Sequence, residues 1–210
     1  GRLLEILNEV KSRNQSSMIS AGHSVAMQRA LSYVSKIGKT VDTVQGYDAY
    51  RFIEDIELDY DNKKSGVISR LKELSEMLFA SSNMMVEFAG NESEYKSFEK
   101  LASEFAKELH RRTDSGTGYV PKLKKINEGL KSAGQVQYVC RAGNFIKNGL
   151  KYTGALRVLK VMMGYDYLWN NIRVKGGAYG CMSGFSRNGD SYFVSYRDPN
   201  LKNTIDIYEG

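Results

Sequence analysis

The segment that most constrains how this chain can fold is a long apolar run from Gly154 to Arg173, which meets two adjacent glycines at 176 and 177. Apolar side chains fall on nearly every side of a helix drawn through it, a pattern typical of a helix that is buried on most sides. Glycine commonly ends a helix, so the pair Gly176 and Gly177 predicts where this one stops. Arg173 precedes the break and Tyr179 follows it.

The residues beyond the glycines predict a β-hairpin and then a helix. The ranges 178–185 and 191–196 favour strands, and the sequence Arg-Asn-Gly-Asp at 187–190 is a strong turn signal between them. A helix is expected at 201–208. Before the apolar run, residues 135–141 alternate between apolar and polar side chains and predict another strand.

The first half of the chain reads as mainly helical. Apolar residues recur at spacings of three and four, and Asn91 with Glu94 has the form of a capping box at a helix start. The expected elements are helices at 2–13, 18–34, 47–58, 62–80 and 92–110, a polar loop at 36–46 and a strand at 83–89.

The composition shifts abruptly to small polar residues at 113–118, which predicts a linker there. We place a domain boundary between residues 112 and 134. Together with the elements above, this predicts an α+β fold in which helices pack on antiparallel-rich sheets.

Composition excludes some classes of protein. The 210 residues are 41% hydrophobic, an ordinary globular profile, and no apolar run approaches the roughly 18 residues of a membrane span. The net charge is +6, but the basic residues are dispersed, so we expect neither a nucleic-acid partner nor a membrane. Cys140 and Cys181 are expected to be buried free thiols in a reducing compartment. Because the first helix starts in mid-pattern without a signal sequence, we expect an excised fragment.

Two familiar site motifs are missing. The two histidines, His23 and His110, are 87 residues apart and lie in no zinc-binding motif, so we expect no metal site in this chain. The Gly-Lys-Thr sequence at 38–40 lacks the first glycine of a P-loop, because Tyr33 occupies that position.

Arg173 and Tyr179 are the best candidates for chemistry. A guanidinium and a phenol on either side of a tight turn can hydrogen-bond a substrate carbonyl and the oxyanion that forms on attack. Neither generates a nucleophile, so both would assist a centre located elsewhere. Purely structural roles stay open, since an arginine can cap helix carbonyls and a tyrosine often begins a strand.

Three segments carry a resemblance to a known family: 166–180 (Asp-Tyr-Leu-Trp-Asn-Asn-Ile-Arg-Val-Lys-Gly-Gly-Ala-Tyr-Gly), 193–200 (Phe-Val-Ser-Tyr-Arg-Asp-Pro-Asn) and 22–29 (Gly-His-Ser-Val-Ala-Met-Gln-Arg). They resemble the C-terminal half of the pitrilysin/insulysin superfamily of zinc metallopeptidases, in its presequence-protease (falcilysin-like) branch. The resemblance covers nearly the whole chain.

The resemblance implies an enzyme of two halves, each with two similar α/β sandwich domains, that close around a chamber. Residues 1–112 would be the C-terminal part of the third domain, 113–133 a linker and 134–210 the first part of the fourth. Zinc would bind in the first domain, outside this chain. Arg173 and Tyr179 would hold and polarise the scissile carbonyl, and the substrate would also contact Gly176, Gly177 and Ala178.

The implied partners are unstructured peptide substrates and the zinc-bearing N-terminal half of the same protein, and the fragment alone is expected to be inactive. The bacterial cytoplasm is the expected compartment, with an organelle matrix as the other possibility. Two alternatives stay open: a non-catalytic partner subunit of the same superfamily that only binds peptides, and a basic domain that binds nucleic acid.

Overall fold

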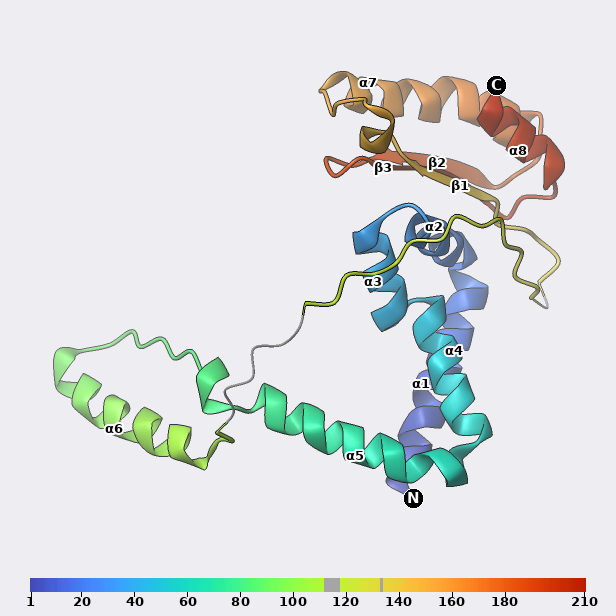
Figure 1. The fold of residues 1–210 in the computed structure, drawn as a ribbon. Helices are drawn as coiled ribbons and strands as arrows, with labels where there is room; N and C mark the ends of the chain where they lie inside the picture. Colours follow the sequence, from blue (N-terminus) through green and yellow to red (C-terminus); the bar gives the residue numbers. More distant parts are fainter. Residues whose placement is uncertain (112–117, 133) are drawn as a thin grey trace. The chain divides into compact units, whose positions relative to one another are not determined.

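The computed structural model shows two compact units and confirms the α+β class (Figure 1). It describes residues 1–111, 118–132 and 134–210. One unit is formed by residues 1–57 together with 120–210, and the other by residues 58–119. Part of the predicted linker, 113–117 and 133, lies outside the described residues. The division into parts of two similar domains at 112 and 134 stays a prediction.

The first unit is built on a three-stranded antiparallel sheet in the order β1-β3-β2. Its strands are β1 (Cys140–Asn144), β2 (Gly180–Phe185) and β3 (Asp190–Tyr196). The predicted hairpin joins β2 to β3: the Gly189 N–H donates to the Ser186 carbonyl over 3.0 Å, and Gly189 has a φ of +90°. Glycine takes up this left-handed conformation without steric cost.

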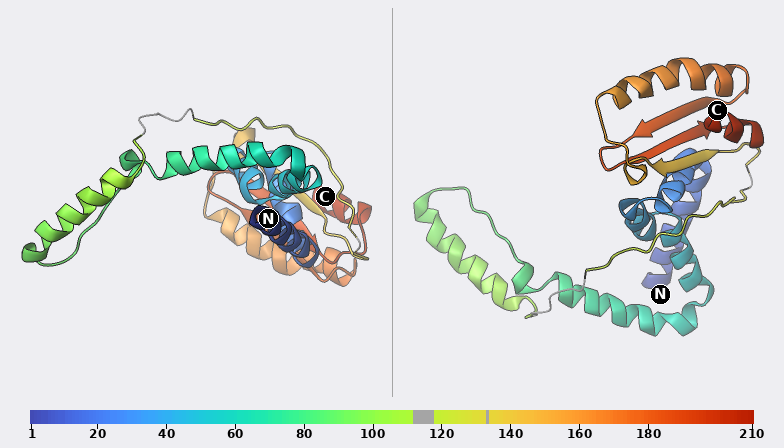
Figure 2. Two further views of the ribbon diagram at one scale, coloured as in Figure 1. Left: turned by 90° about the horizontal axis from the view of Figure 1, so that it is seen from below. Right: turned by 45° about the horizontal axis from the view of Figure 1, so that its top comes forward.

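One face of the sheet is covered by the apolar run and by α8 (Lys202–Glu209), as Figure 2 shows. The run forms α7 (Ala155–Met162) and continues through two π-helical stretches, η3 (Met163–Tyr167) and η4 (Trp169–Val174). Between this helix and the sheet lies the core, formed by Val139, Leu168, Ile172, Ala178 and Tyr208.

The prediction that this helix is buried on most sides is wrong. Val158, Met162 and Tyr165 are exposed, the last of them by 81%. The sheet covers only one side of the helix, so an all-round apolar pattern does not produce all-round burial among the described residues.

The opposite face of the sheet packs on α2 (Gly22–Ser32). The His23 ring meets the Tyr196 ring edge-on, with 4.9 Å between their centres. Gly22 is required here, because a Cβ at that position would lie 2.3 Å from the Tyr138 ring. Helix α1 (Arg2–Ser20) is joined to α4 (Tyr47–Leu58) by an ion pair of 2.8 Å between Lys11 and Glu57.

The predicted polar loop at 36–46 is wrong, because Lys36–Gln45 forms helix α3. Ser35 caps its start: the hydroxyl accepts a hydrogen bond from the Gly38 N–H over 3.2 Å. The glycine that suggested a loop has another role. A Cβ at Gly38 would lie 2.7 Å from the Leu31 carbonyl oxygen, so glycine lets α2 and α3 approach closely.

The second unit contains α5 (Tyr60–Leu78) and α6 (Glu92–Glu108). The capping box at Asn91 is present, and the Glu94 carboxylate accepts from the Asn91 N–H over 3.4 Å. The strand predicted at 83–89 is wrong: these residues form the end of a 3₁₀ turn and an extended segment with no strand partner among the described residues. Their alternating apolar side chains pack on α6 instead, with Phe88 stacked on Phe98 at 4.6 Å.

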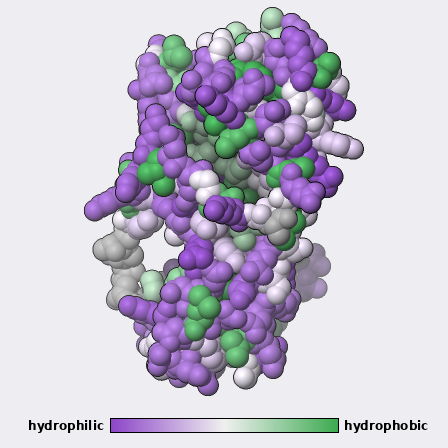
Figure 3. Space-filling model, turned by 90° about the vertical axis from the view of Figure 1, so that its right-hand side faces the viewer, coloured by the Kyte–Doolittle hydropathy of each residue, from purple (hydrophilic) through white to green (hydrophobic). Residues whose placement is uncertain are grey.

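Hydrophilic residues predominate on the molecular face shown in Figure 3, and hydrophobic residues form small separate groups there. In the part of the chain that the structure describes, no helix has the length and apolar character needed to cross a membrane.

Candidate functional site

Arg173 lies in the π-helical stretch that ends at the glycine pair. Its guanidinium carbon sits 4.1 Å from the centre of the Trp169 ring, four residues earlier on the same helix. A guanidinium over an aromatic face is attracted by the ring quadrupole. The arginine is exposed, and no described carboxylate forms an ion pair with it. Its hydrogen-bond donors are therefore directed but uncommitted to a carboxylate.

The glycine pair forms the end of this helix. The Gly177 N–H donates to the Arg173 carbonyl over 2.9 Å, and the Ala178 N–H donates to the Ile172 carbonyl over 3.1 Å. Gly177 has a φ of +79°, and a Cβ at Gly176 would lie 2.5 Å from the Ile172 carbonyl oxygen. Both positions therefore require glycine for the turn itself. Their predicted contact with substrate stays a prediction.

Ala178 belongs to the core, with only 4% of its surface exposed. Its methyl group anchors the turn against Leu168 and Ile172. Any contact of Ala178 with a peptide would therefore run through its backbone.

Tyr179 directly precedes β2 and is 68% exposed. Its N–H donates to the Tyr196 carbonyl over 2.9 Å, which fixes its backbone to the end of β3. The guanidinium carbon of Arg197 lies 5.9 Å from the centre of the Tyr179 ring. The phenol is thus held at its base and accessible at its tip, beside a second cation.

Arg197 forms a β-bulge next to Tyr179. Gln137 exchanges backbone hydrogen bonds with Asp198, and Val139 accepts one from Ser195, so the β3 side carries one extra residue. Arg197 has a φ of +48°, and it is the one non-glycine residue with positive φ among those described. Bulges are common next to active sites, where they redirect side chains. Such backbone strain also concentrates at functional sites.

The bulge also explains a partly wrong prediction. The strand expected at 135–141 begins at Cys140 and runs to Asn144. Pairing before Cys140 is reduced to one isolated bridge between Gln137 and Asp198, because the extra residue on the partner strand interrupts the ladder.

The structure thus brings Arg173 and Tyr179 to the two ends of one turn with both side chains exposed. Among the described residues, no hydrogen bond or ion pair joins them to each other. A guanidinium and a phenol both donate to oxygen, so together they can bind a carbonyl that becomes an oxyanion. Sequence reasoning missed the supports for this pair, Trp169 and Arg197, although both lie inside the two quoted segments.

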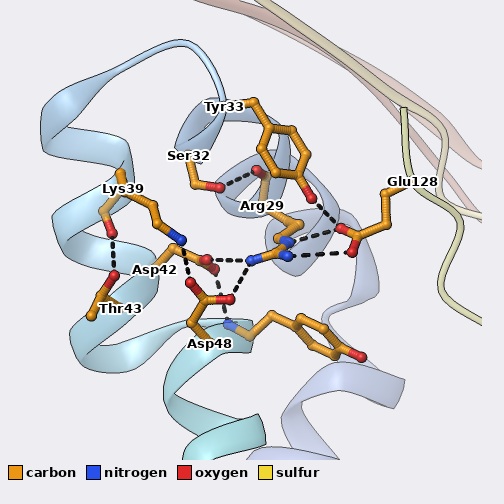
Figure 4. Close-up of polar contacts among 9 residues, drawn as sticks. Arg29, Ser32, Tyr33, Lys39, Asp42, Thr43, Asp48 and Glu128 are labelled. Atoms are coloured by element: carbon orange, nitrogen blue, oxygen red, sulfur yellow. Dashed lines mark hydrogen bonds and ion pairs between the residues drawn. The ribbon is translucent and has the colours of Figure 1, made fainter. Parts of the chain in front are cut away.

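A second polar cluster, which the sequence did not reveal, is centred on Arg29 of α2 (Figure 4). The Arg29 guanidinium forms ion pairs of 2.6 Å with Asp42 and Asp48 and of 2.7 Å with Glu128. Tyr33 donates to Glu128, and Lys39 pairs with Asp48. The cluster joins α2, α3 and α4 to the segment around residue 128. Recognising Lys36–Gln45 as a helix is the signal that would have placed Asp42 beside Arg29.

Electrostatics in the Arg29 cluster are those of a closed ion-pair network. Burial raises the pKa of Asp42, although Arg29 opposes that shift. Hydrogen bonding to Arg29 lowers the pKa of Glu128. Burial disfavours the charge on Asp48, but Lys39 and Arg29 outweigh it and lower its pKa. Every charged group here has a partner, so the cluster fits a structural role.

No metal site is built from the residues that the structure describes: no group of three or more His, Cys, Asp or Glu side chains gathers closely enough to hold an ion. A catalytic zinc usually takes three protein ligands, so the described part of this chain does not fit that role.

Comparison with known proteins places two regions of the chain in one family. Residues 1–56 match the family model for the region associated with peptidases of family M16, subfamily C, and residues 127–210 match the model for the PreP C-terminal domain. Both regions fall in the unit that contains the sheet, Arg173 and Tyr179.

Individual relatives agree with these family matches. Protein HypA of Clostridium perfringens is 39% identical over 208 residues, which cover 99% of this chain and 21% of that protein. Presequence protease 1, chloroplastic/mitochondrial, of Arabidopsis thaliana is 28% identical over 211 residues, which cover all of this chain and 20% of that protein. The mitochondrial presequence protease of Yarrowia lipolytica is 29% identical over 198 residues, covering 90% of this chain and 20% of that protein.

The chain spans about a fifth of the length of the curated relatives it matches. The resemblance seen in the sequence is confirmed by the two family matches and by these relatives. The chain belongs to the family of presequence-protease-like M16 peptidases.

Proposed function

We propose that this chain is the substrate-facing, non-metal part of a zinc-dependent endopeptidase that degrades unstructured peptides. The observation that carries the proposal is the turn that places Arg173 and Tyr179 at its two ends, both exposed, with hydrogen bonds fixing the backbone between them. Zinc and the general base are proposed to lie outside residues 1–210, in the N-terminal half of the parent protein. The bacterial cytoplasm or an organelle matrix is the proposed compartment.

In this proposal Arg173 and Tyr179 bind the carbonyl oxygen of the scissile peptide bond. Both are hydrogen-bond donors, and their bonds strengthen as negative charge develops on that oxygen. The Trp169 ring supports the guanidinium and so limits the directions it can take. The glycine turn leaves no side chain between the two groups, which gives an extended peptide room to lie across it. The isolated chain is expected to be inactive, because neither residue activates a nucleophile.

The proposal is tested by peptide cleavage with the complete parent protein. Tyr179→Phe and Arg173→Ala each remove donors to the oxyanion, and removal of one such donor typically costs about 10²–10³ in rate. We expect kcat/KM to fall by that order while the metal content is unchanged. Tyr165→Phe and Arg187→Ala are matched controls, since both residues are exposed and lie outside the turn.

Normal turnover by both the Tyr179 and the Arg173 variant would overturn the proposed roles. A parent protein that binds peptides but cleaves none, with or without a chelator, would indicate the non-catalytic partner subunit instead.

A further inference from the structure

The two sequence segments that identify the site meet at the glycine turn through Asn200. The Asn200 side-chain amide donates to the carbonyl oxygen of Gly176 over 2.6 Å. Its neighbour Pro199 lies under the turn, since a Cβ built on Gly177 would be 3.6 Å from the proline ring. One side chain from the segment after β3 therefore holds the backbone that separates Arg173 from Tyr179.

The carbonyl that Asn200 binds is one that the helix itself leaves without a partner. The last carbonyls of a helix have no N–H group ahead of them within the helix. In this helix, the carbonyls of Ile172 and Arg173 accept from the turn itself, through Ala178 and Gly177. Gly176 lies beyond them, and the Asn200 amide is the donor that the structure gives its carbonyl.

Asn200 is itself rigidly anchored by Asp198. That aspartate is fully buried, and one of its carboxylate oxygens accepts from the Asn200 N–H over 2.8 Å. The other oxygen accepts from the Thr204 hydroxyl of α8 over 2.7 Å. The Asp198 N–H donates to the Gln137 carbonyl over 2.8 Å. The position of the Asn200 amide is thus set by α8 and by the residues just before β1.

From this arrangement we infer that Asn200 is a positioning residue: it fixes the glycine turn and thereby the spacing of the Arg173 and Tyr179 donors. The inference rests on the proposed function of those two residues. Asn200 touches no reacting atom in this scheme and acts only through the turn. Displacing a catalytic group by about 1 Å can cost on the order of 10² in rate, so one hydrogen bond at this point has leverage on turnover.

The test uses Asn200→Asp in the complete parent protein. Aspartate has nearly the shape of asparagine, but its carboxylate cannot donate to the Gly176 carbonyl and repels it. We expect kcat to fall about 10-fold or more, within the rate cost of a small misplacement, while KM stays within about twofold. Asn148→Asp makes the same chemical change at an exposed side chain outside the turn and should leave both constants unchanged. Asn200→Ala removes the amide without adding a charge and should reproduce the fall in kcat.

A double-mutant cycle separates positioning from general damage to the fold. If Asn200 acts through Tyr179, then Asn200→Asp should cost less than about threefold in a Tyr179→Phe background, because coupled residues are not additive. Equal costs in both backgrounds, or a kcat within twofold of wild type for both Asn200 variants, would overturn the inference. The proposed function fails separately, and this inference with it, if Tyr179→Phe and Arg173→Ala retain normal turnover.

Discussion

The guanidinium of Arg173 lies over the indole of Trp169, with 4.1 Å between the guanidinium carbon and the ring centre. Both residues stand on the same π-helical stretch, so the contact is local and needs no other element of the fold. An exposed cation–π contact contributes about 0.5–1 kcal/mol. That is enough to favour one direction of an arginine side chain that is otherwise free to swing.

We therefore predict that Trp169→Leu lowers kcat/KM of the complete parent protein about two- to fivefold, the rate equivalent of that contact energy. Trp169→Phe keeps an aromatic face and should lose less. The comparison is a steady-state peptide-cleavage assay, with Tyr165→Leu as the control at an exposed position of the same helix. In an Arg173→Ala background, Trp169→Leu should have no further effect. A full-sized effect there would show that the indole acts on something other than Arg173.

The two glycines of the turn are predicted to be required for stability as well as for access. Gly177→Ala forces a Cβ into a φ of +79°, which costs about 1–2 kcal/mol. Gly176→Ala should cost at least as much, because its Cβ would lie 2.5 Å from the Ile172 carbonyl oxygen. Urea denaturation measures both changes. Gly164→Ala is the control: nothing lies within 4 Å of its Cβ, and it should be neutral or stabilising.

Elements set by local chemistry could be predicted from the sequence. The hairpin turn at 186–189 depends on Gly189 and its immediate neighbours, and the start of α6 depends on Asn91 and Glu94. The failures came where a distant element decided the outcome. Residues 84–89 alternate like a strand but pack on α6, and Gly38 looks like a loop glycine but sits where α2 approaches α3.

The candidate site divides in the same way. Arg173, Tyr179 and the glycine break were visible because they are adjacent in the chain. The bond from Asn200 to Gly176 spans 24 residues, and the bulge at Arg197 depends on its pairing with Gln137 and Tyr179. No spacing rule connects such positions, so the supports of the site could not be derived before the fold was known.

The Arg29 cluster gives a prediction about stability. Arg29→Met should destabilise the protein by roughly 3 kcal/mol, because the buried Asp42 carboxylate and Glu128 lose their partner and stay charged. Arg13→Met is the matched control, since Arg13 is exposed and pairs with Glu9 four residues away on α1. That change should stay within about 0.5 kcal/mol. Equal free energies of unfolding for the two variants would contradict the structural role of the cluster.

The cysteines predict a loss of stability at alkaline pH. Burial raises the pKa of the Cys140 thiol to about 12, with a smaller contribution from Cys181, and burial raises that of Cys181 to about 11. In the unfolded chain each thiol loses its proton near pH 9.0. Between pH 9 and these raised values the native state binds more protons than the unfolded state, so the free energy of unfolding falls as pH rises.

Two measurements check this prediction. Urea denaturation at pH 8 and at pH 10.5 should show a smaller loss of stability in Cys140→Ala/Cys181→Ala than in wild type, because the variant lacks both titrating thiols. Iodoacetamide at pH 8 should label the native protein far more slowly than the protein unfolded in urea, since a neutral buried thiol is a poor nucleophile. Labelling of both thiols at the unfolded rate would show that they are neither buried nor shifted.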